Sequence, residues 1–297
     1  MEYATLGKSG LQVSKIGFGC MVLRGSEKEN EILIAGALEL GINYFDTADF
    51  YEDGQNEIKI GTLLKPNRNK VIIASKVGNK RQPDGSTSWN AGKAYILQAA
   101  DESLKRLQTD HIDLYQLHGG MMEDNIDETI EAFELLKQQG KIRFYGISSI
   151  RPNVIREYVA KSNITSVMMQ YSLLDRRPEE TCFDLLEKNK ISVVTRGSVA
   201  QGLLVDKPAK PYLNYTEKEV VKAAQAIQQV AGLDRSNAQV ALQFALAPKV
   251  VSSAVVGIRT VKQLVDVVGS LDVVQLSGEE LDLLRNAIIP NQYEQHR

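Results

Sequence analysis

Four polar residues of this chain have side chains suited to acid–base chemistry: Asp46, Tyr51, Lys76 and His118. A phenol can give its proton to a carbonyl oxygen, but with an ordinary pKa of about 10 it needs help from nearby charge. An ammonium stabilises the phenolate that forms, and a carboxylate keeps that ammonium charged and oriented. An imidazole can donate a hydrogen bond to the substrate oxygen. The four residue types together suit protonation of a carbonyl coupled to hydride delivery.

Each of the four residues also has an ordinary structural interpretation. Asp46 or Asp49 can cap a helix that begins near Asn56, because a carboxylate accepts hydrogen bonds from free N–H groups of the first turn. A single Tyr is usually a packed aromatic, a single Lys a solvated strand end and a single His a structural residue. The functional interpretation is favoured because all four follow short strand-like runs, at equivalent positions of the predicted fold.

Short apolar or β-branched runs alternate with segments of helical periodicity along the chain. The eight predicted strands are residues 16–19, 44–46, 71–76, 114–118, 144–148, 166–170, 192–196 and 254–257. Predicted helices include residues 30–40, 94–107, 126–139, 152–162 and 179–189. Strands separated by helices must be parallel and covered by those helices. We therefore predict an α/β fold, a (β/α)8 TIM barrel whose reactive residues meet at the carboxyl ends of the strands. An open doubly wound sheet is the alternative, because alternation alone is compatible with both.

Two segments lie outside the simple alternation. Residues 2–15 predict an N-terminal β-hairpin, with strands at 3–6 and 11–13 around a Gly-containing turn. The long interval between the seventh and eighth strands predicts a loop and an extra helix over 216–231, where Thr216 and Glu219 have capping-box spacing. A length of 297 residues allows two domains, but no linker interrupts the alternation. We therefore expect one barrel domain over 1–297.

Composition excludes several other classes of protein. The chain has 35 Lys plus Arg against 37 Asp plus Glu and no long basic run, which argues against a nucleic-acid partner. Its two cysteines and three histidines predict neither a disulfide framework nor a metal site. No run approaches the roughly 18 apolar residues of a membrane span. The first ten residues lack a basic region followed by an apolar run, so we expect a cytoplasmic protein with no membrane partner.

Five segments carry a specific resemblance to a known family. They are NYFDTADFYEDGQNE at 43–57, IIASK at 72–76, SLKRLQTDHIDLYQLH at 103–118, YGISS at 145–149 and AQGLL at 200–204. These segments resemble the aldo-keto reductase family, and the likeness extends over nearly the whole chain. The family is built on a (β/α)8 barrel and reduces aldehydes or ketones with NADPH. The resemblance implies that Tyr51 is the general acid, that Asp46, Lys76 and His118 complete its tetrad, and that the substrate is a small carbonyl compound.

The resemblance also implies residues that bind the nicotinamide half of the cofactor. Gly19, Cys20 and Met21 would lie beside the nicotinamide. The carboxamide would be held by Ser148, Ser149 and Gln170, although the family more often has Asn where Ser149 stands. The segment that covers the pyrophosphate would include Arg196, Ser198, Gln201, Gly202 and Leu203. Within it, Arg196 and Ser198 depart from the commoner sequence, and an Arg can bind phosphate through two hydrogen bonds.

The segment VGIRTVKQL at 256–264 resembles the family's adenosine-phosphate segment. Gly257 permits a close approach of the backbone, and the following helix offers free N–H groups to an anion. The resemblance implies that Arg259 meets the 2′-phosphate and selects NADP over NAD, with Gln263 at the adenine. Val267 stands where the family often has Asn. The run GFG at 17–19 begins like a dinucleotide-binding fingerprint, but Val22 breaks the pattern.

Two functions of other classes compete with a reductase. The same family resemblance includes potassium-channel β-subunits, which makes a nucleotide-binding regulatory subunit with little or no turnover the second interpretation. A barrel lyase or hydrolase without a cofactor is the third. No feature of the sequence assigns a physiological substrate or an oligomeric state.

Overall fold

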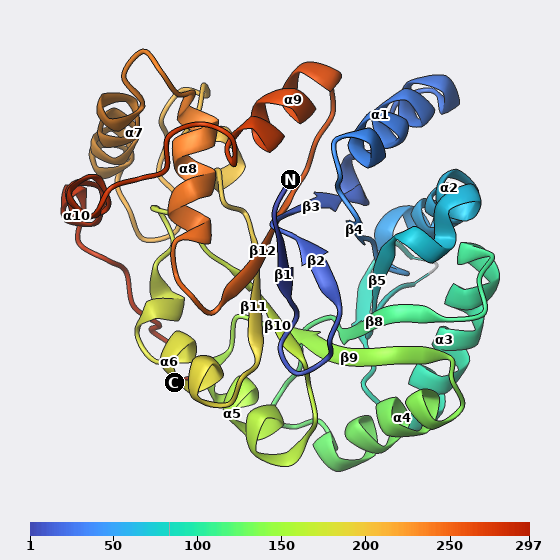
Figure 1. The fold of residues 1–297 in the computed structure, drawn as a ribbon. Coiled ribbons are helices and arrows are strands. Elements are labelled where there is room, and N and C mark those ends of the chain that lie inside the picture. The colour runs from blue at the N-terminus through green and yellow to red at the C-terminus, as the bar shows by residue number, and fades with distance from the viewer. Residues whose placement is uncertain (83) are drawn as a thin grey trace.

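Eight parallel strands close into a barrel in this computed structural model, which describes residues 1–82 and 84–297 (Figure 1). In spatial order the strands are β3 (Ile16–Gly19), β4 (Tyr44–Asp46), β5 (Ile72–Val77), β8 (Ile112–Leu117), β9 (Ile142–Ser148), β10 (Ser166–Gln170), β11 (Ser192–Arg196) and β12 (Val251–Val256). Every neighbouring pair is parallel, and β12 pairs with β3. The closed ring confirms the predicted (β/α)8 barrel and excludes the open sheet.

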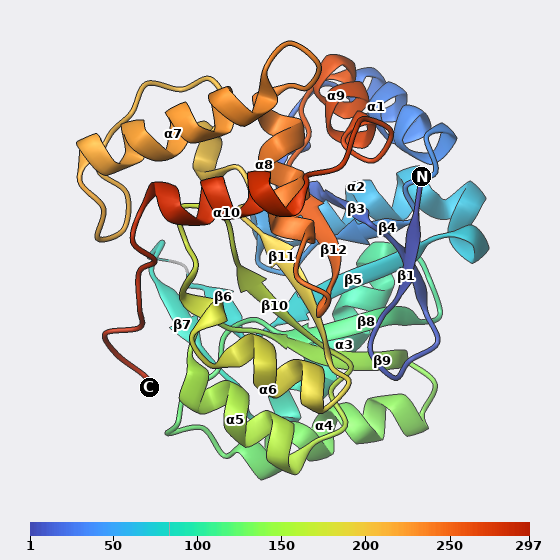
Figure 2. The same ribbon diagram turned by 60° about the vertical axis from the view of Figure 1, so that its left-hand side comes forward.

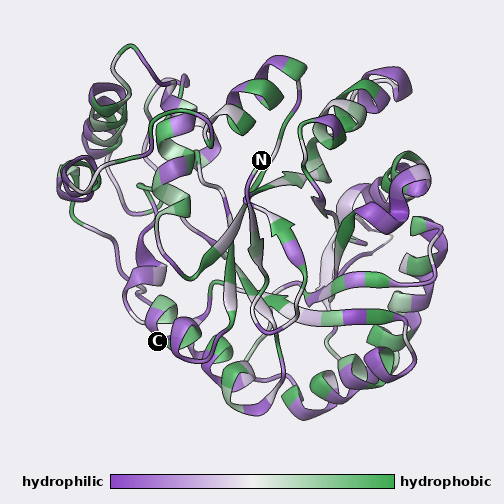
Figure 3. Cartoon of the chain, viewed as in Figure 1, coloured by the Kyte–Doolittle hydropathy of each residue, from purple (hydrophilic) through white to green (hydrophobic). Residues whose placement is uncertain are grey.

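Helices surround the barrel on its outer side (Figure 1). They are α1 (Glu27–Glu39), α2 (Gln55–Leu64), α3 (Lys93–Leu107), α4 (Ile126–Gln138), α5 (Pro152–Lys161), α6 (Cys182–Lys188), α7 (Glu217–Ala231), α8 (Asn237–Leu246), α9 (Val261–Gly269) and α10 (Gly278–Ala287). The helices alternate hydrophobic and hydrophilic residues, as expected for elements with one buried face (Figure 3). No helix within the described ranges is long and apolar enough to cross a membrane.

The interval between β11 and β12 departs from the prediction of one extra helix. It holds two helices: α7, which begins at the predicted capping box of Thr216 and Glu219, and α8, which was missed. Seven of the ten residues of α8 are buried, so the helix has almost no polar face and its sequence gives no amphipathic signal. The predicted helix 179–189 also begins late, at Cys182, after a 3-10 turn that contains Pro178.

Side chains inside the barrel form an apolar layer near its amino-terminal end. The members include Tyr44, Ile72, Ala74, Leu114, Met168, Val194 and Val255. The predicted N-terminal hairpin, β1 (Tyr3–Thr5) and β2 (Gln12–Ser14), adds Leu6, Leu11 and Val13 to the same layer and lies across this end of the barrel (Figure 1). The hairpin therefore closes the barrel from below, and water is excluded from its lower half.

A second hairpin, β6 (Asn79–Arg81) and β7 (Thr87–Trp89), follows β5 at the opposite end of the barrel (Figure 2). The Trp89 ring packs so closely on Gly78 and Gly119 that a Cβ on either glycine would lie 2.6 and 3.2 Å from its carbons. The indole N–H donates to Asp124 Oδ1 at 2.8 Å. These contacts attach the hairpin to the loop that follows His118.

Gly61 lies where α2 packs closely on α3, so a substitution there tests the packing of the two helices. A Cβ at Gly61 would lie 2.5 Å from the Leu107 carbonyl oxygen, so the backbone of one helix must move. We expect Gly61→Ala to lower the free energy of unfolding by about 1–3 kcal/mol, despite the better helix propensity of Ala. Urea unfolding and the melting temperature measure this change.

Gly36→Ala in α1 is the matched control, because a Cβ there meets only the Leu264 side chain, at 3.3 Å. A methyl group of a side chain can move aside, so this variant should melt at the wild-type temperature or slightly above it. Equal melting temperatures for Gly61→Ala and the wild type would show that α2 and α3 pack less tightly than described.

Candidate active site

Strand alternation brings the predicted site residues to one rim. Successive residues of a barrel strand point alternately inward and outward. Tyr44, Ala74 and Leu114 point inward, so Asp46, Lys76 and Gln116, two residues further along the same strands, also point inward. Ser148, Gln170 and Arg196 occupy the corresponding last positions of β9, β10 and β11. The upper layer inside the barrel is therefore polar, above the apolar layer.

A buried ion pair lies at the centre of this polar layer. Lys76 Nζ is 2.5 Å from Asp46 Oδ1 and donates to the Thr47 carbonyl at 2.7 Å, and both side chains are almost wholly buried. Gln116 Nε2 lies 3.5 Å from Asp46 Oδ2. Gln116 was not among the residues predicted from the sequence. Its position two residues before His118, on the same side of the strand, was the available signal.

Burial and charge act in opposite directions on the two members of this pair. Burial alone lowers the pKa of Lys76, but the neighbouring Asp46 and Tyr51 outweigh it and raise the pKa above its usual value. Burial raises the pKa of Asp46, and Lys76 opposes that rise. Lys76 Nζ lies 3.4 Å from the Tyr51 hydroxyl and 5.1 Å from the centre of its ring. The ammonium is thus placed to stabilise negative charge on the Tyr51 oxygen.

Tyr51 is held by an unusual loop. The next three residues, Glu52, Asp53 and Gly54, have φ values of 52°, 53° and 86°, and left-handed backbone is costly for the two that are not glycine. Two ion pairs hold these residues: Glu52 with Lys59 at 2.9 Å and Asp53 with Arg81 of β6 at 2.9 Å. The loop turns sharply after Tyr51 and leaves its hydroxyl beside Lys76.

His118 faces Tyr51 across the rim. The two rings lie edge to face, with centroids 5.9 Å apart and planes at 82°. Burial, reinforced by the charges of Lys76 and Arg196, lowers the pKa of His118 to about 3. Its Nδ1 is buried and has no hydrogen-bond partner among the described residues. A neutral imidazole carries one N–H, so His118 can donate one hydrogen bond next to the Tyr51 hydroxyl.

Residues predicted to hold the carboxamide lie on the neighbouring strands. Ser148 and Ser149 are buried at the end of β9, and the Ser149 hydroxyl accepts from the Arg151 N–H at 3.2 Å. Gln170 Oε1 accepts from Arg196 Nη1 at 3.0 Å. Arg196 is the last residue of β11 and pairs with Gln170 in the barrel register, so it lies at the same rim as the tetrad. Its binding to a cofactor phosphate stays a prediction.

Two loops carry the remaining predicted cofactor residues. After β11, Ser198 is buried, Gln201 and Gly202 have φ values of 58° and 96°, and the Leu203 side chain is buried, which leaves only its backbone for a ligand. After β12, Gly257 packs on Val22, where a Cβ would lie 3.1 Å from Cγ1. The Arg259 N–H donates to Gln263 Oε1 at 3.0 Å, just before α9 begins.

The end of β3 contributes the last predicted group. Cys20 is fully buried, its thiol lies 3.6 Å from the Phe18 carbonyl, and its own carbonyl accepts from Asn56 Nδ2 at 2.9 Å. Met21 is half-exposed beside it. Gly19 pairs with Asp46 in the barrel register. Gly19 and Met21 therefore present accessible atoms next to the tetrad, and Cys20 is part of the packing below them.

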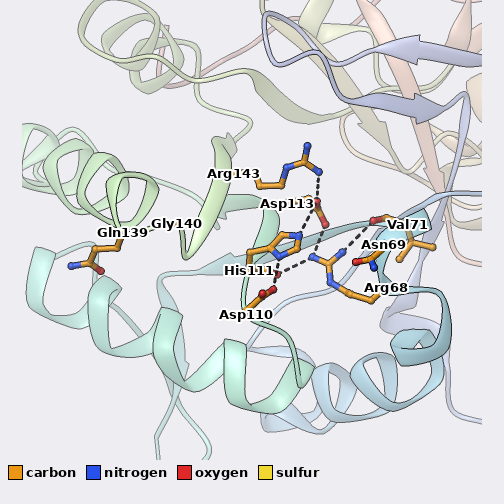
Figure 4. Close-up of a pocket in the computed structure, with 9 residues that line it drawn as sticks. All are labelled: Arg68, Asn69, Val71, Asp110, His111, Asp113, Gln139, Gly140 and Arg143. Carbon is orange, nitrogen blue, oxygen red and sulfur yellow. Dashed lines mark hydrogen bonds and ion pairs between the residues drawn. The ribbon is translucent and has the colours of Figure 1, made fainter.

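A cavity of about 590 Å³ lies near the amino ends of β8 and β9, away from the tetrad (Figure 4). His111 lines it, as expected for a residue at the end opposite the reactive rim. Asp113 is buried there between Arg68 and Arg143, each at 2.8 Å. Within the described ranges no group of His, Cys, Asp and Glu could hold a metal ion. Charged side chains that line this cavity form ion pairs with one another.

Comparisons with known proteins agree with the architecture. The model of the aldo/keto reductase family matches residues 15–289. An uncharacterized oxidoreductase of Bacillus subtilis, YqkF, is 49% identical over 309 residues, covering 100% of both chains. L-galactose dehydrogenase of Arabidopsis thaliana is 31% identical, over 96% of this chain and 92% of its own. Among solved structures, the holo form of aldo-keto reductase AKR11C1 from Bacillus halodurans is 48% identical, with a TM-score of 0.93 over 100% of this chain and 99% of its own.

The low pKa of His118 predicts a pH-dependent stability. An unfolded histidine has its ordinary pKa of about 6.5, whereas folded His118 has a pKa of about 3. Between these values the unfolded chain binds one proton more, so the free energy of unfolding falls as the pH drops from about 6.5 towards 3. His118→Gln removes that proton and should flatten the slope by up to about 1.4 kcal/mol per pH unit.

Urea unfolding of the wild type and His118→Gln at several pH values below 7 measures the two slopes. His296→Gln, at an exposed position of the C-terminal tail, is the control and should keep the wild-type slope. If His118→Gln and the wild type show the same slope, folded and unfolded His118 bind their proton equally, and burial does not keep His118 neutral.

Proposed function

The chain belongs to the aldo/keto reductase family, and from that premise we propose that it reduces aldehydes or ketones to alcohols with NADPH, with Tyr51 as the general acid. The observation that carries the proposal is the buried Asp46–Lys76 pair, whose ammonium lies 3.4 Å from the Tyr51 hydroxyl. The family's enzymes are oxidoreductases that use nicotinamide cofactors. A bound reduced nicotinamide supplies the hydride that the protein's own side chains cannot.

The side chains divide the proton chemistry among them. Tyr51 donates its proton to the carbonyl oxygen, and Lys76 stabilises the phenolate left behind. Asp46 orients Lys76 and balances its charge within the barrel. His118, held neutral by burial and by two nearby cations, donates a hydrogen bond that positions the oxygen. Each role requires that water be kept from the pair, which the apolar layer below provides.

Selection of NADPH over NADH is assigned to Arg259. It precedes α9, in which the Gln263 N–H donates to Thr260 Oγ1 at 3.1 Å and the two N–H groups before it can meet an anion. Arg259 forms no ion pair among the described residues. A guanidinium can bind a phosphate through two charge-assisted hydrogen bonds. The proposal also assigns Ser148, Ser149 and Gln170 to binding of the nicotinamide carboxamide. It assigns the segment from Arg196 to Leu203 to binding of the cofactor phosphates.

The substrate side of the rim is partly apolar. Met21, Met122 and Ile150 are each between two-fifths and one-half exposed on loops that follow barrel strands. Exposed apolar side chains beside a polar reacting group favour a carbonyl compound with an apolar body. An aldehyde or ketone with an apolar chain is therefore the substrate class to test first.

Removal of the Tyr51 hydroxyl tests the general acid. We expect Tyr51→Phe to lower kcat by about 100-fold or more, because proton donation by a positioned acid contributes on that scale. NADPH binding should change by less than about twofold. Consumption of NADPH with a panel of aldehydes, dicarbonyls and ketones measures the rates, and fluorescence titration measures the cofactor dissociation constant.

Tyr3→Phe is the matched control, because the Tyr3 hydroxyl donates to the Gly41 carbonyl at the other end of the barrel. This variant should keep the wild-type rate. A wild-type rate no faster than that of Tyr51→Phe across the panel would count against a reductase, and with NADPH still bound it would favour a regulatory subunit.

Arg259→Ala tests the cofactor preference. The lost charge-assisted hydrogen bonds should raise the dissociation constant of NADPH about tenfold or more and leave that of NADH nearly unchanged. Arg156→Ala, at an exposed position of α5, removes the same charge elsewhere and should change neither value. An equal loss of affinity for both cofactors would contradict a contact with the 2′-phosphate.

A further inference from the structure

Both polar atoms of the Gln170 side-chain amide form hydrogen bonds within the protein. Its Nε2 donates to Asp175 Oδ2 at 2.9 Å and to the Tyr212 hydroxyl at 3.1 Å. Its Oε1 accepts from Arg196 Nη1 at 3.0 Å. An amide nitrogen has two hydrogens, and both are used by these partners. The oxygen keeps one lone pair that no described residue occupies.

The chemistry of the partners fixes which way the amide points. A carboxylate can only accept hydrogen bonds, so the nitrogen must face Asp175. A guanidinium can only donate, so the oxygen must face Arg196. A rotation of the amide by 180° would set two acceptors against each other at Asp175 and two donors at Arg196. The observed orientation is therefore strongly favoured.

Asp175 is itself held firmly. It is fully buried, and its carboxylate accepts two hydrogen bonds from Arg177, both at 2.7 Å. Its backbone closes a tight turn with Ser172 through two hydrogen bonds of 3.0 and 3.2 Å. The Arg177 guanidinium stacks on Tyr293 of the C-terminal tail, 5.3 Å from the ring centre. The loop of residues 172–177 thus fixes the position of this carboxylate, and the C-terminal tail supports the loop through Tyr293.

We propose that Asp175 is a positioning residue for the cofactor, because it holds the Gln170 amide so that only an acceptor oxygen is offered to the nicotinamide carboxamide. The proposal rests on the proposed NADPH-dependent function. Gln170 Oε1 then accepts a hydrogen bond from the amino group of the carboxamide. The hydroxyls of Ser148 and Ser149 can donate to the carboxamide oxygen. Asp175 acts through Gln170 and does not touch the cofactor.

The test compares two ligands on one variant. Asp175→Asn has the same shape but offers both a donor and an acceptor, so the Gln170 amide can take either orientation. We expect the dissociation constant of NADP+ to rise about tenfold. That of 2′-phospho-ADP-ribose, which lacks the nicotinamide ring, should change by less than about twofold. The kcat at saturating NADPH should fall far less than the affinity.

A second ligand pair tests the direction of the hydrogen bond. The 3-acetylpyridine analogue of NADP+ carries a methyl group in place of the carboxamide amino group. Wild-type protein should bind the analogue more weakly than NADP+, and Asp175→Asn should lose most of that preference. An unchanged preference in the variant would overturn the assignment of Gln170 as an acceptor.

Two further variants separate positioning from stability. Asp113→Asn removes an equally buried carboxylate that pairs with two arginines at the other end of the barrel (Figure 4). It should lower the melting temperature while the ratio of the two dissociation constants stays at the wild-type value. Tyr212→Phe removes one of the two acceptors of Gln170 Nε2 and should weaken NADP+ binding in the same direction, by a smaller factor.

Failure of the proposed function and failure of the positioning role of Asp175 would give different results. If wild-type protein binds neither NADP+ nor its fragment, the proposed function fails. If wild type binds both ligands and reduces carbonyl compounds, while Asp175→Asn weakens both ligands equally or neither, only the positioning role of Asp175 is overturned. Should Asp175→Asn not fold, the same comparison on Tyr212→Phe decides the question.

Discussion

The buried pair of Asp46 and Lys76 is the constraint on which the upper half of the barrel depends. Two charges removed from water are costly unless their remaining hydrogen-bonding groups find partners. Here the Thr47 carbonyl and the Tyr51 hydroxyl, from the segment after β4, and Gln116 of β8 lie around the pair. The pairing of β4 with β5 and of β5 with β8 brings these strands together with the loop of Tyr51. The site and the fold therefore depend on each other.

The two ends of the barrel use the same physical means for different purposes. At the amino-terminal end the buried Asp113 is enclosed by Arg68, Arg143 and the Ile73 N–H, so its charge is neutralised within the protein. At the carboxyl end, among the residues that the structure describes, Asp46 pairs with one ammonium and Arg196 bonds only to the neutral Gln170. The first arrangement is balanced and structural. The second keeps positive charge available to a ligand, as expected for the face of a barrel where loops carry function.

Much of this organisation is present in the sequence as spacing. The alternation of strands and helices predicts the barrel, and the final polar residue of each strand predicts Asp46, Lys76 and His118 at one rim. Hydrogen-bond partners that are brought together only by the folded structure cannot be predicted from such spacing. Tyr212 lies 42 residues from Gln170, and Asp175 lies in a turn whose direction no periodicity records. Likewise α8 was missed because burial on all sides removes the amphipathic pattern by which helices are recognised.

Positive charge lies beside His118 although the formal net charge of the chain is −2. The charged groups that lower the pKa of His118 are Lys76 and Arg196. Burial is the main reason why a second proton on His118 is disfavoured, and these two positive charges add to it, so its pKa falls. The same positive charge favours any group that becomes negative beside it, and in the proposed reaction that group is the Tyr51 oxygen. One arrangement of charge therefore keeps the hydrogen-bond donor neutral and stabilises the acid after it has lost its proton.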